Sequence, residues 1–149
     1  MKTLFDSETV TDIVDRIDRL TPLSKPGWGK MDVAQMLAHC SAVLYTATGI
    51  TKPKQHWMGI LLGRFWKPVY YNETQFDHNS PTHSTWIITD ERDFDTEKNG
   101  LIENIKRFQK NGMQKVTTHS HPFFGKLTPA QWGIGMFKHL DHHLRQFKV

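Results

Sequence analysis

The chain has 149 residues, 38% hydrophobic and 23% charged, which is typical of one soluble domain with a single core. Lys and Arg number 19 against 15 Asp and Glu, and this mild, scattered excess argues against nucleic-acid binding. The single cysteine, Cys40, excludes an intramolecular disulfide, the charged N-terminus is unlike a signal peptide, and no apolar run is long enough to span a bilayer. We therefore expect one cytoplasmic domain covering residues 1–149.

The first predicted helix lies within residues 6–22, DSETVTDIVDRIDRLTP. Its apolar residues recur at three- and four-residue steps from Val10 to Leu20, and acidic residues crowd its start. Pro22 lies just beyond its end. This pattern is typical of an amphipathic helix that packs one face against a core.

The second predicted helix occupies residues 31–49, MDVAQMLAHCSAVLYTATG. Asp32, followed three positions later by Gln35, has the pattern of a capping box, in which the two residues satisfy backbone N–H groups at a helix start. Gly49 is the expected stop. These signals predict both ends of the helix.

The segment after the second helix is harder to interpret. Its apolar part, HWMGILLGRFWKPVYY at residues 56–71, is interrupted by Gly59, Gly63 and Pro68 and predicts a short helix or two. A long connection follows, with a short extended piece at residues 85–89. A connection of this length in a small domain is usually functional or covers the core.

Two further helices are predicted in the second half of the chain. One runs from about residue 95 to residue 111, with apolar residues on one face and Gly112 as its stop. Thr128 caps the other, and Pro129 then stands at the first helical position, which proline favours.

Four main helices without a convincing sheet predict an all-α fold. The expected architecture is an antiparallel four-helix bundle with a long, partly irregular connection between the second and third main helices. The alternative is an α+β domain in which residues 69–90 form a β-hairpin.

Three histidines lie close together in the last predicted helix, in FKHLDHHLRQF at residues 137–147. At about 100° per residue, His139 and His143 fall on the side of the apolar arc, whereas His142 falls away from it. A histidine pair at this four-residue spacing can place two imidazole nitrogens on one metal ion. The alternative is a pair of hydrogen-bonded core histidines.

A third histidine, His39, lies at the edge of the apolar face of the second predicted helix. Alone it would be read as a core residue, but beside His139 and His143 it favours a three-ligand metal site. Three imidazoles leave a coordination position open for water or substrate, which is the pattern of catalytic rather than structural sites. Imidazole ligands suit zinc, nickel, iron or copper.

The motifs QMLAHC, residues 35–40, and HPFFGKLTPAQWG followed by HLDHHLRQF, from residue 121 onward, resemble the DinB/YfiT-like superfamily of metalloenzymes, and within it a bacterial subgroup described as a domain of unknown function. The resemblance implies a four-helix bundle in which His39, His139 and His143 hold a divalent ion, zinc or nickel, with iron as a further candidate. It also implies a thiol-dependent transferase or a hydrolase, a small-molecule substrate, a low-molecular-weight thiol as partner, and a homodimer.

No residue stands out as a general base, so the catalytic residues stay unknown at this point. Acidic candidates in the long connection and its flanks are Glu73, Asp77 and Glu91, each more typical of a solvated surface. His119 and His121 precede the last helix and are expected near the rim of the site, if they have a role.

The remaining candidates are weaker. Cys40 follows a proposed ligand, but its helical position predicts a small buried residue rather than a nucleophile. His56, His78 and His83 have no pattern that connects them to the site.

Two other functions compete with the enzyme hypothesis. One is a metal-binding or small-ligand-binding bundle without turnover, which the missing general base favours. The other is a membrane-surface protein that uses residues 56–71, because Arg64 and Lys67 accompany the aromatic residues there. A segment that covers the core explains the same residues, so we expect no membrane partner.

Overall fold

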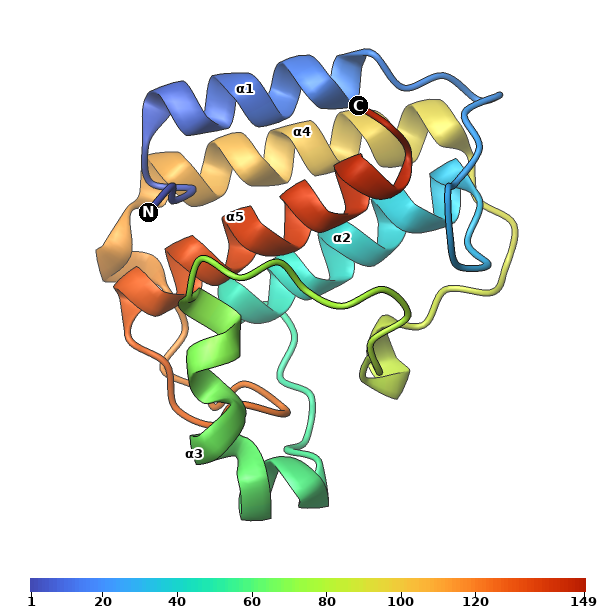
Figure 1. Cartoon of the computed structure of the whole chain (residues 1–149). Coiled ribbons are helices and arrows are strands. Elements are labelled where there is room, and N and C mark those ends of the chain that lie inside the picture. Colours follow the sequence, from blue (N-terminus) through green and yellow to red (C-terminus); the bar gives the residue numbers. More distant parts are fainter.

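The computed structural model describes residues 1–149 and contains five α-helices, two single-turn 3₁₀-helices and no β-strand (Figure 1). The elements, in chain order, are α1 (Ser7–Asp18), α2 (Val33–Ala47), α3 (Trp57–Tyr71), η1 (Ser84–Trp86), α4 (Phe94–Asn111), η2 (Met113–Lys115) and α5 (Pro129–Gln146). The expected all-α class is confirmed. The α+β alternative is wrong, because residues 69–90 form no hairpin and the expected extended piece at residues 85–89 begins as the 3₁₀ turn η1.

Four of the helices surround the core. Helix α4 packs against both α1 and α2, and α5 packs against the same two helices. The sequence colours in Figure 1 show that α1 and α5 run in one direction and that α2 and α4 run in the other. Fully buried side chains from all four helices fill the centre; among them are Ile13, Leu37, Ile105 and Trp132. None of the helices has the length and hydropathy required to span a bilayer.

The two helices that carry the predicted histidine ligands begin at capping boxes. In α2 the Gln35 amide donates to Asp32 Oδ1 at 2.8 Å, and the Asp32 amide donates to Gln35 Oε1 at 3.1 Å. In α5, Thr128 and Gln131 exchange the equivalent bonds at 3.2 and 3.0 Å. These bonds fix where each helix starts and therefore which side chains face the core.

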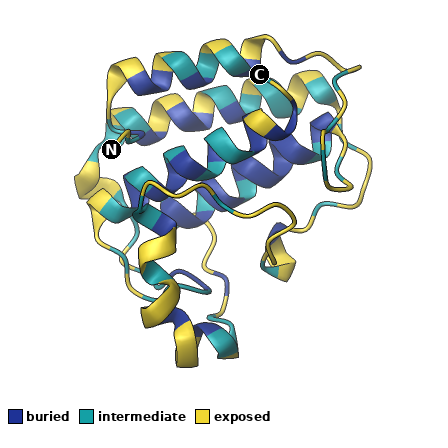
Figure 2. Cartoon of the chain, viewed as in Figure 1, coloured by how far each residue is buried: buried dark blue, intermediate teal, exposed yellow.

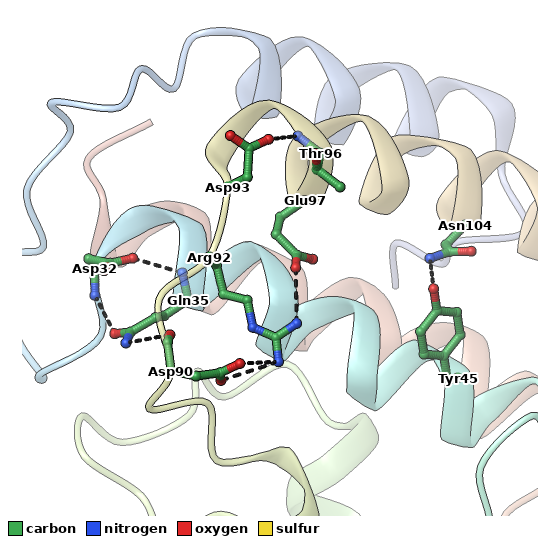
Figure 3. Close-up of polar contacts among 9 residues, drawn as sticks. All are labelled: Asp32, Gln35, Tyr45, Asp90, Arg92, Asp93, Thr96, Glu97 and Asn104. Atoms are coloured by element: carbon green, nitrogen blue, oxygen red, sulfur yellow. Dashed lines mark hydrogen bonds and ion pairs between the residues drawn. The ribbon is translucent and has the colours of Figure 1, made fainter.

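The connection that follows η1 is fastened to α2 and α4 (Figure 3). The Gln35 side-chain amide donates to the Asp90 carbonyl at 3.2 Å, and Arg92 forms ion pairs with Asp90 and Glu97 at 3.0 and 3.1 Å. Asp93 caps α4 through the Thr96 amide at 2.8 Å. The contacts hold the segment after η1 across the end of the bundle where α2 begins.

Helix α3 does not cover the core, contrary to expectation. It is one continuous helix that packs on α5 and stands apart from α1, α2 and α4 (Figure 1). Gly59 and Gly63 do not interrupt it, because they face the backbone of residues 122–124, where a Cβ would clash. Figure 2 shows most of α3 exposed. Its exposed apolar side chains are Trp57, Ile60, Leu61, Leu62, Phe65, Trp66 and Val69.

Candidate metal centre

The structure brings together the three histidines that the sequence selected. His39 comes from α2, and His139 and His143 come from adjacent turns of α5. One nitrogen atom from each ring can be chosen so that all three lie within 4.8 Å of one another. The closest approach is 3.0 Å, between Nε2 of His39 and Nε2 of His139.

His39 is held in one tautomer by a backbone carbonyl. Its Nδ1 lies 2.7 Å from the Trp86 oxygen at the end of η1. A carbonyl oxygen only accepts, so Nδ1 carries the hydrogen and Nε2 presents its lone pair to the other histidines. Ligating histidines commonly donate their second N–H to a carbonyl in this way, which orients the ring and fixes the tautomer.

His143 is held in the same tautomer through Gln146. The Gln146 amide nitrogen donates to the Trp28 carbonyl at 2.6 Å, so its Oε1 faces His143 Nδ1 at 2.8 Å and accepts a hydrogen from it. Nε2 of His143 is therefore also unprotonated. Gly29, in a left-handed conformation with φ of 81°, leaves room for the Gln146 amide, which a Cβ at this position would meet.

His139 completes the cluster, with its ring centroid 5.0 Å from that of His39 and 4.7 Å from that of His143. Two unprotonated nitrogens facing each other at 3.0 Å would repel, so this contact needs either a hydrogen on His139 Nε2 or a cation between the rings. Nitrogen ligands about 2.0 Å from a tetrahedral zinc ion stand about 3.3 Å apart, close to the observed separation. The donor set and its spacing therefore fit a divalent transition-metal ion.

Burial keeps the three rings neutral. Desolvation lowers the pKa of all three, to about 3 for His143 and well below the usual value for His139. Neighbouring imidazoles lower the pKa of His139 and His143 further, since each would be charged beside another. Metal binding requires neutral imidazole, so the cluster is in its ligand-competent form at neutral pH.

A cavity of about 300 Å³ opens onto the three histidines. Its volume suits a small molecule, and most of the hydrophobic residues in its wall are aromatic. Its wall also includes Tyr70, Phe76, Trp86, His121, Phe123 and His142. No Asp or Glu lines it.

Two loop histidines, His119 and His121, were expected near the rim of the site. Only His121 lines this cavity. Its Nδ1 accepts hydrogen bonds from the backbone amides of Phe123 and Phe124 at 3.1 and 3.3 Å. The ring is buried, which lowers its pKa to about 3, so it is neutral and carries its hydrogen on Nε2. No protein atom accepts that hydrogen, so Nε2–H is available to an oxygen atom of a bound molecule. His119 instead lies against the Pro53 carbonyl, with Nε2 at 3.2 Å.

The other histidines have structural contacts. His56 caps α3 and His83 caps η1 through their Nδ1 atoms, while His78 stacks on Trp28 with ring centroids 3.8 Å apart. His142 is not part of the triad, as the helical wheel predicted, but it is half-buried and lines the cavity. The sequence did not indicate this contact, because residues 76–82 fold over the polar side of α5.

None of the acidic candidates reaches the cavity. Glu73, Asp77 and Glu91 are exposed, and Glu73 lines a separate hollow on the other side of Phe76. Cys40 is buried in the core with its Sγ 3.7 Å from Met36 Sδ, and burial raises the pKa of its thiol. It is the small buried residue that its helical position predicted.

Fold and site together define an all-α protein with a three-histidine cluster close enough to hold a metal ion. The chain belongs to the family described as "Protein of unknown function (DUF1569)", which matches residues 4–149. No protein with a curated description matches the chain, nor does any solved structure. The family match does not test the resemblance to the DinB/YfiT-like superfamily, which stays a prediction.

Proposed function

We propose that the protein is a metal-dependent enzyme that acts on a small molecule, with a divalent ion held by His39, His139 and His143. The observation that carries the proposal is the fixed tautomer of His39 and His143. Trp86 and Gln146 each accept a hydrogen from Nδ1, so Nε2 of both rings carries a free lone pair, and that of His39 lies 3.0 Å from Nε2 of His139. With no carboxylate or thiolate in the cluster, three neutral ligands leave a coordination position open to the cavity.

The proposed chemistry rests on a bound ion and His121 in the cavity and on the absence of a carboxylate from its wall. A divalent ion held there would supply Lewis-acid polarisation of a coordinated oxygen or sulfur atom. His121 can donate one hydrogen bond from Nε2 to a substrate oxygen, and the aromatic wall limits access of water. Because no carboxylate is present as a base, the site favours a co-substrate that ionises readily. A low-molecular-weight thiol meets this condition better than water does, which favours thiol transfer over hydrolysis.

The same proposal includes zinc as the first candidate for the ion and a DinB-type four-helix bundle as the fold. Imidazole ligands and the 3.0 Å separation of the His39 and His139 Nε2 atoms suit zinc, and nickel or iron are the next candidates. A DinB-type four-helix bundle is supported by the mutual packing of α1, α2, α4 and α5 and by the origin of the ligands, one on α2 and two on α5.

A binding protein without turnover is the second candidate function. The absence of any Asp or Glu in the cavity favours it, since proton transfer then depends on substrate or solvent. The distinction is experimental: a metal site without turnover binds the ion and small ligands but accelerates no reaction.

The first experiment measures metal content by mass spectrometry after reconstitution with zinc, nickel or iron. We expect one ion per chain in the wild type and a loss in His39→Ala, His139→Ala and His143→Ala. His142→Ala is the matched control, because His142 lines the same cavity outside the triad and should keep the ion. A wild type that takes up no metal would rule out the proposal.

Turnover is tested next on metal-loaded protein with a thiol and a panel of electrophiles, and with ester substrates. Thiol consumption that depends on metal, and that is lost in His139→Ala but kept in His119→Ala, whose ring lies outside the cavity, supports the enzyme. Stoichiometric metal without turnover in either panel supports the binding protein.

A further inference from the structure

Helix α3 has the reverse of the usual surface pattern. The side of α3 that faces the protein carries Gly59, Gly63 and Tyr70, all buried. Directly opposite, at four-residue steps, Trp57, Leu61, Phe65 and Val69 form an exposed stripe, of which Trp57 is 64% exposed and Phe65 62%. We call these four residues the α3 stripe.

The orientation of α3 cannot be reversed to bury this stripe. The glycines lie against the backbone of Pro122 and Phe123, at a distance that leaves no room for a Cβ. The His56 amide also donates to the Pro122 carbonyl at 2.9 Å, which fastens the start of the helix. Larger residues therefore cannot take the inner positions, and the apolar side chains are held outward. A patch of this extent on one exposed helix is typical of an interaction surface.

The end of the molecule around α3 carries only positive formal charges. It consists of residues 50–71 and the loop 115–126, which hydrogen bonds join at several points, including His119 Nε2 to the Pro53 carbonyl. Neither segment contains Asp or Glu, and indeed residues 33–72 and 104–140 contain none. The basic residues of this end are Lys52, Lys54, Arg64, Lys67, Lys115 and Lys126.

The charges decide between the two apolar partners that could cover the stripe. A second copy packed on it about a two-fold axis would bring the same cations together with no carboxylate from either copy to pair them. An anionic bilayer surface supplies negative charge around an apolar layer. Arg64 flanks the stripe with its guanidinium 4.6 Å from the Phe65 ring, in the position of a cation that stays with the headgroups while the ring enters the acyl boundary.

We propose that the α3 stripe and the surrounding basic residues bind the surface of anionic membranes. The helix lies in the interface plane and does not cross it, in agreement with its length of 15 residues. Tyr70, near the C-terminal end of α3, lines the histidine cavity. Membrane contact through α3 therefore brings that cavity close to the lipid surface. The proposal does not depend on whether the histidines hold a metal.

Flotation of the full chain with lipid vesicles tests the proposal. We expect binding to vesicles of phosphatidylcholine mixed with phosphatidylglycerol and little binding to phosphatidylcholine alone. Phe65→Asp should abolish flotation, while Leu23→Asp, at an exposed apolar position far along the chain from α3, should leave it unchanged. Circular dichroism confirms that each variant is folded.

A charge variant tests whether the basic residues around the α3 stripe contribute to membrane binding. Lys54→Gln combined with Arg64→Gln should weaken binding to the anionic vesicles about 25-fold, because each basic residue near such a surface contributes about a factor of five. Arg19→Gln combined with Lys25→Gln removes the same charge elsewhere and should have little effect. The proposal would be overturned by equal binding to neutral and anionic vesicles, or by no binding to either kind. It would also be overturned if the protein did not float with vesicles but sedimented as a dimer that Phe65→Asp dissociates.

Discussion

The histidine cluster and helix α3 break the usual distribution of polar and apolar residues in opposite ways. The histidine cluster buries titratable rings, since His39 is 3% exposed and His143 8% exposed. Helix α3 exposes large apolar side chains, although a core-covering role was expected for it. Each arrangement costs stability in the isolated chain, since buried imidazoles lose hydration and exposed apolar surface gains none of the benefit of burial. Both regions therefore point to partners outside the chain: a cation for the first and a lipid surface for the second.

Zinc should stabilise the protein through the cluster and leave α3 unaffected. At a free zinc concentration of about 100 times Kd, linkage predicts about 2.7 kcal/mol, or a rise in Tm of about 5–10 °C for a domain of this size. Thermal unfolding of His143→Ala should show no such rise, whereas Phe65→Asp should keep it in full. A zinc effect of equal size in His143→Ala would place the bound ion elsewhere.

Gln146 affects the histidine cluster without itself being one of the three ligands. Gln146→Leu removes the acceptor of the His143 Nδ1 hydrogen and the bond to the Trp28 carbonyl. Loss of such an orienting partner lowers metal affinity about 10- to 100-fold. Competition with a chromophoric chelator measures the change, with exposed Gln114→Leu as the control. An unchanged affinity would show that the tautomer is fixed by other contacts.

The free-energy cost of burying the His121 imidazole can be measured from the pH dependence of unfolding. Burial lowers its folded pKa to about 3, below the unfolded value of about 6.5, so the unfolded chain takes up the proton first as pH falls. This residue therefore destabilises the fold progressively below pH 6.5, by about 2 kcal/mol at pH 5. His121→Asn keeps an acceptor for the Phe123 and Phe124 amides and removes the titration. Urea unfolding at pH 7 and pH 5 should show the smaller loss in the variant.

The α3 stripe should be nearly neutral for folding, in contrast to the cluster. Leu61 is 64% exposed, so Leu61→Ser should change the free energy of unfolding by less than about 0.5 kcal/mol. Leu37→Ala, in the core, is expected to cost about 2–5 kcal/mol and serves as the positive control. Urea unfolding without lipid measures both. A large loss for Leu61→Ser would mean that the stripe packs within the protein.

The sequence was enough to predict most of the helices and the residues of the cluster. The capping box predicted at Asp32 and the N-cap predicted at Thr128 are local signals that the structure confirms, and the four-residue spacing of His139 and His143 depends only on helix geometry. Their meeting with His39 could be expected, because His39 and His139 lie at the edge of the apolar face of their helices and His143 lies within it.

The orienting groups could not be predicted in the same way. The carbonyls of Trp86 and Trp28 come from irregular segments whose path depends on tertiary contacts, such as that between Gln35 and Asp90. The exposure of α3 was missed for a related reason. An apolar run reads as buried until it is known that Gly59 and Gly63 form the inner face.

The separation of the ligands along the chain has a consequence for the order of folding events. His39 and His139 stand 100 residues apart, and their meeting requires both the α2–α5 packing and the placement of η1. Closing so long a loop is entropically costly, and contacts of this kind form late. The ion should therefore bind a scaffold that is already assembled, and refolding should proceed at the same rate with or without it. Chelators would then remove the metal and leave the folded chain intact.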